Sequence, residues 1–351
     1  MQEYKTEHKD YSKYAVIMVS TDQLIFNEKS SVRARMVQYS KLYKELHIII
    51  FSKKRIEPVK ISDNCTVYST RSFIRPNYVS DGQKLGRQIM RKIGKDDLLL
   101  VTCQNPFETG LVGKCLANLH LNSELLLQIH TDLYSPYFCS TKIGFLHSIL
   151  NRINFFISGF TLQHAQVIQV VSKKMADSLV DRGISQDKII LKPIHVDVEQ
   201  IKNSQPSFDL HQKYPKFKKI ILMVSRLETE KNVSMAIDAM NIVNAQLKDV
   251  GMVIVGSGSL LNSLKNQASK LKISNSVEFV GWQTDTISYY KGCDVFLMTS
   301  WYEGYGMVFK EAEAAGCKIV STDVGIARDV GAIIADWNSQ DIADKIAKQL
   351  K

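Results

Sequence analysis

The feature that most constrains the fold of this chain is a regular alternation of short apolar runs with longer segments of helical periodicity. In the first half we predict strands at six runs rich in Val, Ile and Leu: residues 15–20, 47–52, 65–69, 98–103, 125–130 and 167–172. The alternation then restarts, and we predict further strands at residues 220–225, 252–256, 277–281, 295–300 and 318–322. Short, continuous apolar runs are typical of parallel strands that helices bury on both faces. The sequence therefore predicts two doubly wound α/β sheets.

The length of the chain and one polar, proline-marked stretch indicate how these sheets are divided. A single hydrophobic core stops growing beyond about 250–300 residues, so we expect this chain of 351 residues to form two domains. The stretch from about Pro193 to Pro215 separates the two sets of strands, and we place the domains at residues 1–205 and 206–351. We expect a cleft between the domains, with ligands at the carboxyl ends of the strands.

The overall composition is that of an ordinary globular protein, but the excess of basic side chains indicates an anionic partner. The net charge is +10, and residues 1–205 carry 28 basic against 19 acidic side chains. Such an excess attracts nucleic acid, an anionic membrane surface or a phosphorylated substrate, unless it is simply a well-solvated lysine surface. The six cysteines form no C-x-x-C pair, the N-terminus is too polar for a signal peptide, and no run of about 18 apolar residues occurs. We therefore expect reduced thiols and a cytoplasmic protein, with peripheral contact at the inner membrane face as a further expectation.

Several polar side chains follow predicted strands of the second half, where ligands of parallel sheets bind. Arg226 and Lys231 follow the first of these strands, and two cations at one strand end suit a diphosphate, although an exposed basic turn is the simpler alternative. Gly256 follows the next strand and allows close backbone approach to a ligand. The dinucleotide glycine fingerprint is incomplete there, which argues against a nicotinamide-dependent oxidoreductase. Trp282 or Gln283 can cover a flat base, with simple packing of Trp282 as the alternative.

The stretch SWYEGYGMVFKEAEAAG (300–316) holds carboxylates before and inside a predicted helix. We predict a glycine loop and then a helix starting near Met307, whose first N–H groups form an anion site. Helix electrostatics explain Glu313 and can explain Glu311, because acids in the first turns of a helix are stabilised. They do not explain Glu303, which precedes the helix. Two carboxylates beside a phosphate site repel the phosphate unless they bind hydroxyl groups, which indicates a sugar and a ribose.

Five motifs of the second half occur in the order found in one enzyme family. They are VSRLETEKN, IVGSG, VEFVG, the EGYGMV loop and the EAEAAG helix, with Glu303 and Glu311 eight positions apart. The first half contributes weaker landmarks, among them TCQNPFETGLVG, LLLQIHTDLYSPYF and QVVSKKM. Together they resemble the retaining nucleotide-sugar glycosyltransferases of the GT4 type, the group 1 glycosyl transferases. The resemblance implies the GT-B fold, in which a Rossmann-like acceptor-binding domain and a Rossmann-like donor-binding domain face each other across a cleft.

The resemblance also implies how the donor phosphates are bound. Arg226 and Lys231 hold the diphosphate, and the backbone of Gly306, Met307 and Val308 cradles the distal phosphate. As a nucleoside diphosphate departs, positive charge grows on the anomeric carbon, and positioned cations stabilise the leaving phosphate. The sequence contains no D-x-D triplet, so we expect a site that needs neither a metal nor another cofactor. Retention of configuration is implied by the resemblance alone.

The contacts to the ribose, sugar and base follow from the same resemblance. Glu311 binds the ribose hydroxyls, Glu303 binds hydroxyls of the transferred sugar, and the turn from Trp282 to Gln283 borders the base. His130, at the end of a first-domain strand, matches a family histidine near the sugar and leaving group. Without the resemblance, a core or capping role is the simpler interpretation of His130.

The first domain departs from the family after its first strand. The usual glycine-rich loop is replaced by STDQLIFNEKSSVRARM (20–36), in which Ser31, Arg33 and Arg35 either replace its phosphate contacts or bind the acceptor. The apolar, aromatic segment 142–163 is interrupted by polar residues and cannot span a bilayer. We expect this segment to pack against the core, with a place at a membrane interface as the alternative.

The resulting hypothesis is a hexosyltransferase-type glycosyltransferase. It uses a UDP- or GDP-sugar donor and a glycan or lipid-linked saccharide as acceptor, in the synthesis of cell-surface polysaccharide or glycoconjugates. Two alternatives remain open: a GT-B nucleotide-sugar epimerase, and a nucleotide-sugar-binding protein without turnover. We expect no nucleic-acid partner, because a nucleic-acid surface has no need of carboxylates such as Glu303 and Glu311.

Overall fold

The structure of this protein, a computed structural model, describes residues 4–6, 9–141 and 144–351. Contacts divide it into a first unit, Met1–His130 with Ile149–Lys192, and a second unit, Thr131–Ser148 with Pro193–Lys351. By contacts, the residues between 193 and the predicted boundary at 205 group with the second unit. The physical reason is that helix α6 (Val198–Asn203) packs against helix α11 (Met307–Ala314) of that unit.

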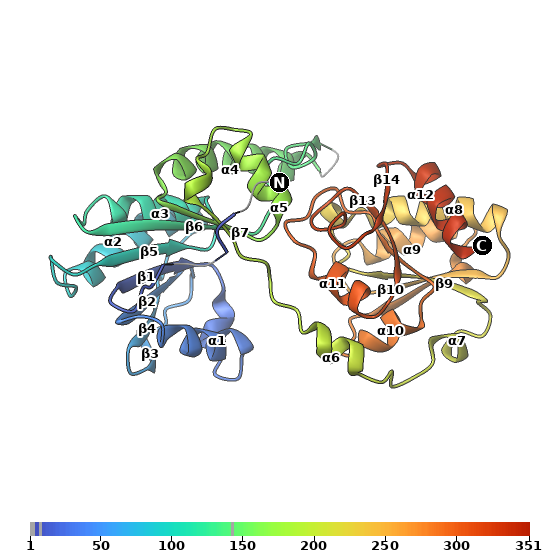
Figure 1. The fold of residues 1–351 in the computed structure, drawn as a ribbon, viewed down its shortest axis with the longest axis horizontal. Coiled ribbons are helices and arrows are strands. Elements are labelled where there is room, and N and C mark those ends of the chain that lie inside the picture. The colour runs from blue at the N-terminus through green and yellow to red at the C-terminus, as the bar shows by residue number, and fades with distance from the viewer. Residues whose placement is uncertain (1–3, 7–8, 142–143) are drawn as a thin grey trace. The chain divides into compact units, whose positions relative to one another are not determined.

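The first unit is an eight-stranded sheet with helices on both faces, α2 and α3 on one and α1 on the other (Figure 1). The strand order is β3-β4-β2-β1-β5-β6-β7-β8, and β3 pairs with β4 antiparallel while the other pairs are parallel. The strands are β1 (Ala15–Ser20), β2 (Glu45–Ile50), β3 (Val59–Ser62), β4 (Cys65–Ser69), β5 (Leu99–Cys103), β6 (Ser123–Ile129), β7 (Val167–Val170) and β8 (Ile189–Leu191). The α-helices are α1 (Ser31–Ser40), α2 (Tyr78–Met90), α3 (Glu108–Ala117), α4 (Phe145–His164) and α5 (Lys173–Val180), and the short 3-10 helices are η1 (Gln23–Phe26), η2 (Arg75–Asn77) and η4 (Gln186–Lys188). The first four residues of α4 group with the second unit.

The second unit is a six-stranded parallel sheet in the order β11-β10-β9-β12-β13-β14. Its strands are β9 (Lys219–Val224), β10 (Val250–Val255), β11 (Val277–Gly281), β12 (Val295–Met298), β13 (Lys318–Thr322) and β14 (Ile333–Ala335). Besides α6, its helices are α7 (Leu210–Lys213), α8 (Val233–Gln246), α9 (Leu261–Lys270), α10 (Ile287–Gly292), α11 (Met307–Ala314) and α12 (Ser339–Leu350), with the 3-10 helices η5 (Thr229–Lys231) and η6 (Ser274–Ser276).

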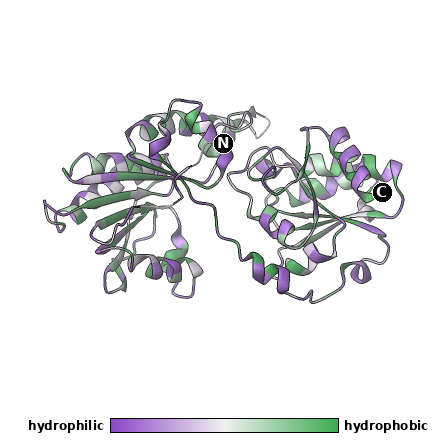
Figure 2. Cartoon of the chain, in the orientation of Figure 1, coloured by the Kyte–Doolittle hydropathy of each residue, from purple (hydrophilic) through white to green (hydrophobic). Residues whose placement is uncertain are grey.

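Apolar residues concentrate along the strands of both sheets, as Figure 2 shows. In β9, Ile221 and Met223 point into the core that the strands share with α8 and α12. On the other side of this sheet, the buried ring of Phe296 lies 5.5 Å from that of Tyr290 and 6.5 Å from that of Phe309, measured between ring centroids. Because both faces are buried, these strands are continuous apolar runs with no polar alternation.

The prediction of two doubly wound sheets is confirmed. Each of the eleven predicted strands is present within two residues at either end, and β1, β4, β11 and β13 have the predicted bounds. Three further strands were not predicted, and they have three or four residues each: β3, β8 and β14. Strands so short contain no apolar run long enough to be distinguished from a loop.

The expectation that segment 142–163 packs against the core is wrong for most of its large side chains, although Leu162 is buried. In α4, Phe145, Leu146 and Phe156 are 71%, 73% and 78% exposed, whereas Ser158 and Thr161 are buried. The large apolar residues of an amphipathic helix usually face the core, and in α4 most of them do not. Residues 142–143 of the segment lie outside the described residues. Within the described ranges, no helix is both long enough and apolar enough to cross a membrane.

Candidate functional site

Two residues predicted from separate motifs meet at the carboxyl ends of two neighbouring strands. Lys231 follows β9 and Glu303 follows β12, and these strands are paired in the centre of the second sheet. The Nζ of Lys231 donates to Oε1 of Glu303 at 2.5 Å, and the same oxygen accepts from Oγ of Ser300 at 2.8 Å. Both side chains of the pair are largely buried, at 14% and 11% exposure. If such a buried ion pair separates, each charged side chain needs a new partner, because a buried charge without one is strongly destabilising.

Hydrogen bonds between loops hold this pair in register. The hydroxyl of Thr299, just beyond β12, donates to the carbonyl oxygens of Lys231 and Asn232 at 3.2 and 3.0 Å. The N–H of Trp301 donates to the carbonyl oxygen of Glu230 at 2.8 Å. Asn232 adopts a left-handed backbone with φ of 49°, which lets η5 end and α8 begin at once. The loop carrying Lys231 is therefore tied to the strand end that carries Glu303.

Arg226, the second predicted cation, lies on the exposed side of the same loop. Its guanidinium donates to Oε1 of Glu230 at 2.7 Å, and its side chain is 70% exposed. The structure therefore places Lys231 in a buried ion pair and Arg226 in an exposed one. An exposed pair of this type is weak, about 0–1 kcal/mol, so the guanidinium is readily available to an anion.

The glycines after β10 allow two loops to pack against each other. At Gly256, where φ is 134°, an added Cβ would lie 1.9 Å from the carbonyl oxygen of Ser225. At Gly258 it would lie 2.4 Å from the carbonyl oxygen of Leu227. The N–H of Gly256 donates to the carbonyl oxygen of Gly281 at 2.8 Å. The role of Gly256 that the structure displays is thus close approach to the β9 loop, and its contact with a donor stays a prediction.

Gly256→Ala should destabilise the protein by at least about 2 kcal/mol, because the added methyl meets backbone and the φ is unfavourable for alanine. Gly281→Ala is the matched control, since φ there is 73° but nothing lies within 4 Å of an added Cβ. We expect the control to cost only about 1 kcal/mol. Urea denaturation of both variants measures the difference, and equal losses would show that the approach to Ser225 is unimportant.

The predicted glycine loop leads into α11 as expected. Gly306 has φ of 79° and precedes the helix, which starts at Met307. An added Cβ on Gly306 would lie 2.7 Å from the ring of Phe309. Both the positive φ and this close contact therefore favour glycine at this position. The first N–H groups of a helix have no partner within it, and together with the helix dipole they form an anion-binding site. Met307 and Val308 supply the first of these groups, close in sequence to Glu303.

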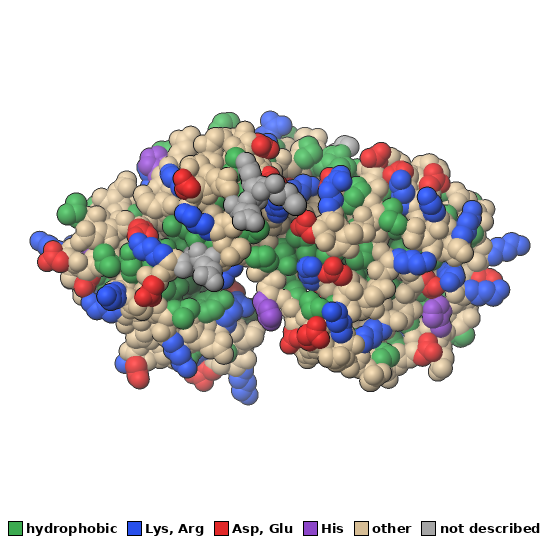
Figure 3. All heavy atoms as spheres, viewed as in Figure 1, with side chains coloured by type: hydrophobic (Ala, Val, Ile, Leu, Met, Phe, Trp, Pro, Cys, Tyr) green, Lys and Arg blue, Asp and Glu red, His purple; other side chains and the backbone are tan. Residues whose placement is uncertain are grey.

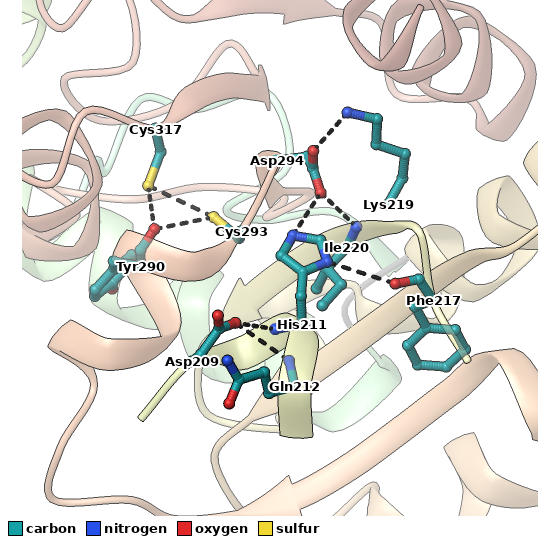
Figure 4. Close-up of polar contacts among 10 residues, drawn as sticks. All are labelled: Asp209, His211, Gln212, Phe217, Lys219, Ile220, Tyr290, Cys293, Asp294 and Cys317. Atoms are coloured by element: carbon teal, nitrogen blue, oxygen red, sulfur yellow. Dashed lines mark hydrogen bonds and ion pairs between the residues drawn. The ribbon is translucent and has the colours of Figure 1, made fainter. Parts of the chain in front are cut away.

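Glu311 is held by a tyrosine that the sequence analysis missed. Oη of Tyr290, in α10, donates to Oε2 of Glu311 at 2.8 Å. Burial and, after it, the charge of Glu311 raise the pKa of Tyr290 well above its usual range. The thiols of Cys293 and Cys317 donate to the carbonyl oxygen of Tyr290 at 3.3 and 3.1 Å, which fixes the end of α10 (Figure 4). Tyr290 belongs to no motif, and nothing in the sequence indicates its contact with Glu311.

If Glu311 binds the ribose of a nucleotide donor, as the family resemblance implies, Tyr290→Phe should raise the KM for that donor roughly fivefold and change kcat little, because one hydrogen bond that orients Glu311 is lost. Tyr289→Phe is the matched control. Tyr289 is equally buried in the same helix, but its hydroxyl accepts from Lys213 at 3.0 Å. Steady-state kinetics of both variants provide the measurement. A larger effect in the control, or an effect on kcat alone, would contradict a role of Tyr290 in orienting Glu311.

The turn after β11 presents a flat apolar surface. Trp282 is 70% exposed and follows Gly281, whose positive φ ends the strand. Nε2 of Gln283 donates to the carbonyl oxygen of Val280 at 2.9 Å, so this amide stabilises the turn. Of the two predicted base contacts, the ring of Trp282 is the more exposed one.

The remaining candidates lie in the first unit. His130 follows β6, its Nε2 is 3.3 Å from Oε1 of Gln128, and surrounding protein desolvates the ring and lowers its pKa. Ser31 and Arg35 are exposed in the first turns of α1. Arg33 is half-buried, with NH1 3.7 Å from Oε1 of Glu28.

The segment Thr131–Ser148 follows β6 in sequence yet packs within the second unit. The ring of Tyr137 lies 4.7 Å from that of Trp301 and 4.8 Å from that of Trp337, between centroids. Oγ of Ser135 donates to the carbonyl oxygen of Trp301 at 3.4 Å. This segment, a family landmark in the sequence, therefore packs on the loop that carries Glu303.

Charged side chains of both signs are interspersed on the face drawn in Figure 3. Among the residues that the structure describes, no group of three or more His, Cys, Asp or Glu side chains lies close enough together to hold a metal ion. The largest concentration of candidate residues is at the strand ends of the second unit.

A family model matches the second half of the chain, and known proteins match longer parts of it. Residues 207–351 match the family model described as "Glycosyl transferases group 1". The chain is 28% identical over 232 residues to the alpha-monoglucosyldiacylglycerol synthase of Streptococcus pneumoniae, covering 63% of this chain and 51% of that protein. It is 25% identical over 223 residues to the UDP-Gal:alpha-D-GlcNAc-diphosphoundecaprenol alpha-1,3-galactosyltransferase of Escherichia coli, covering 62% and 56%. The chain thus spans about half the length of these curated relatives.

Solved structures match almost the whole chain. HepE of Anabaena in complex with UDP superposes with a TM-score of 0.67 at 18% identity, covering 96% of this chain and 90% of that chain. Sucrose-phosphate synthase of Thermosynechococcus elongatus superposes with a TM-score of 0.71 at 16% identity, with the same two coverages. At this identity the likeness shows the fold alone, and it confirms the GT-B fold class. The family predicted from the motifs, the group 1 glycosyl transferases, is the one whose model residues 207–351 match.

Proposed function

We propose that this protein is a glycosyltransferase that moves a sugar from a UDP- or GDP-sugar to a glycan or lipid-linked acceptor, with retention of configuration and without a metal. The match of residues 207–351 to the family model supports sugar transfer. One relative is named for an acceptor carried on diphosphoundecaprenol, and HepE was solved with UDP. We place donor binding in residues 206–351, acceptor binding in residues 1–205 and the protein at the cytoplasmic face of the membrane.

The observation that carries the proposal is the buried pair of Lys231 and Glu303. Donor binding would give each charge a new partner: a diphosphate oxygen for the ammonium, and sugar hydroxyls for the carboxylate. Charge-assisted hydrogen bonds of both kinds are among the stronger contacts in proteins. As the bond between sugar and phosphate breaks, negative charge grows on the leaving oxygen, and a fixed ammonium stabilises it. The pair thus supplies both a leaving-group cation and a clamp on the transferred sugar.

Neighbouring groups extend this site to the rest of a nucleoside diphosphate. The exposed guanidinium of Arg226 and the first N–H groups of α11, at Met307 and Val308, suit phosphate oxygens. Glu311, oriented by Tyr290, suits the ribose hydroxyls. The exposed ring of Trp282 suits a base.

First-unit residues complete the proposal on the acceptor side. Desolvation lowers the pKa of His130, which favours the neutral imidazole near pH 7 and lets one ring nitrogen accept a proton. Ser31, Arg33 and Arg35 suit an anionic group of the acceptor. No side chain singles itself out as a covalent nucleophile, so we propose attack from the face that the leaving group vacates.

The direct test is incubation of the whole chain with labelled UDP- and GDP-sugars, with and without a lipid extract. We expect free nucleoside diphosphate and a labelled lipid-soluble product when the extract is present. A changed sugar still attached to its nucleotide would indicate an epimerase. Tight binding of a donor without any release would indicate a nucleotide-sugar-binding protein and overturn the proposal. A thermal-shift screen of nucleotide sugars selects the donor for these assays.

A further inference from the structure

One side of α4 is a continuous stripe of large apolar side chains. Of the eighteen large hydrophobic side chains exposed in the described part of the chain, eight belong to this helix. Five of them recur every three or four residues and so share one side of the helix. We call this set the apolar stripe; its members are Leu146, Ile149, Ile153, Phe156 and Phe160.

The opposite side of α4 is buried and carries Leu162 beside the hydroxylated side chains of Ser158 and Thr161. Oγ of Ser158 donates to the carbonyl oxygen of Phe155 at 2.7 Å, and Oγ1 of Thr161 donates to that of Pro106 at 2.6 Å. The methyl of Thr161 also fits tightly against α3, since an added Cβ on Gly110 would lie 3.3 Å from it. These contacts fix the rotation of the helix about its axis. The apolar stripe therefore faces outward because the inward side is already packed and its hydroxyls are satisfied.

Basic residues outnumber acidic ones in the sequence around α4. Between Asp132 and Asp177 the sequence has no acidic residue and four basic ones, Lys142, Arg152, Lys173 and Lys174. Arg152 is exposed within α4. From the neighbouring helix α3, Nζ of Lys114 lies 3.9 Å from the centroid of the Phe160 ring. Cations beside an exposed apolar helix face are the combination that binds anionic lipid surfaces.

We propose that α4 is a membrane-docking helix that lies in the plane of an anionic lipid bilayer. The apolar stripe enters the boundary between headgroups and acyl chains, and Arg152 and Lys114 contact headgroup phosphates. The helix lies on the membrane and does not cross it, in line with the absence of a spanning helix among the described residues. This inference goes beyond the proposed sugar transfer, because docking requires neither donor nor acceptor.

Co-sedimentation of the whole chain with vesicles tests the proposal. The variant Ile153→Ser/Phe156→Ser removes apolar area from the stripe at sites that are 51% and 78% exposed. We expect it to lose at least about tenfold in partition to vesicles of phosphatidylglycerol and phosphatidylcholine. The matched control is Phe73→Ser/Leu121→Ser, which removes side chains that are 87% and 95% exposed outside α4. The control should bind within about twofold of the unsubstituted protein.

A second pair of variants tests the charges. Arg152→Gln/Lys114→Gln should weaken binding to the anionic vesicles at least about fivefold and leave the weaker binding to pure phosphatidylcholine unchanged. The proposal is overturned if the stripe variant binds like the unsubstituted protein, or if stripe variant and control lose equally. It is also overturned if the unsubstituted protein does not bind vesicles. In that case, a dimer that light scattering detects for the unsubstituted protein but not for the stripe variant would show that the stripe is a contact between two copies of the chain. Vesicle binding without any sugar transfer would contradict the proposed function alone.

Discussion

Glu303→Gln is expected to lower turnover at least about 100-fold while the protein remains folded. Glutamine keeps the size of the side chain and can still accept a hydrogen bond from Ser300. It removes the negative charge of the carboxylate, which accepts a hydrogen bond from Nζ of Lys231 at 2.5 Å. Under the proposed function, this carboxylate also accepts hydrogen bonds from the sugar hydroxyls as the reaction proceeds. Release of nucleoside diphosphate under saturating donor gives kcat, and circular dichroism checks the fold.

The matched control is Glu313→Gln. Glu313 lies in α11, ten positions after Glu303, and its carboxylate is paired with Lys310 at 2.8 Å and 41% exposed. Glu313 lies in the last turn of α11, so the expected first-turn stabilisation does not apply to it, and its partner is Lys310. An exposed ion pair of this kind contributes little, so replacing Glu313 should change turnover less than about twofold. If Glu303→Gln kept normal turnover, Glu303 would have no place in the reaction. If both variants lost activity equally, the effect would be one of general charge.

Lys231→Met is expected to lower turnover to a similar degree, at least about 100-fold, since the cation proposed to stabilise the leaving phosphate is gone. It should also reduce stability by about 1–3 kcal/mol, because the largely buried carboxylate of Glu303 loses its partner. Lys219→Met is the matched control at the other end of β9. Lys219 forms an ion pair with Asp294 at 2.8 Å, and Asp294 keeps its bond to the N–H of Ile220 (Figure 4).

The double variant Lys231→Met/Glu303→Gln separates the two effects. It removes both charges, so no ion is left unpaired, and we expect it to regain much of the stability that Lys231→Met loses. Its turnover should stay low, because both proposed substrate contacts are missing. Urea denaturation and nucleotide release measure the two quantities on the same preparations. A double variant that recovered activity along with stability would mean that the pair is structural.

The strands were predictable because each is a local pattern. The run at residues 15–20 is apolar up to its final serine, and its strand is buried throughout, as expected when helices cover a strand on both sides. The start of α11 at Met307 was predictable for a similar reason, since a glycine loop before a helical pattern is a local signal. The short strands β8 and β14 were missed, because only pairing with a neighbour distinguishes them from loops.

The candidate site was predictable as a set of residues but not as an arrangement. Motif spacing selected Lys231 and Glu303 separately, and they are 72 positions apart. Their contact depends on β9 and β12 being neighbours, which the order of strands along the chain does not state. Tyr290 was missed because its function is a single hydrogen bond to Glu311 across two helices.

By itself the sequence determined the class of fold, the family of the second half and the chemical types gathered at its strand ends. These follow from periodicity and from motifs, which are properties of residues close together in the chain. The tertiary structure alone decided that the ammonium of Lys231 pairs with Glu303, that Gly256 packs against Ser225 and that the stripe of Phe156 faces outward. Each of these features depends on contacts between segments that are distant in the sequence. Hydrophobic burial is not directional, so the shapes of the packed surfaces and their hydrogen bonds decide which segments are in contact.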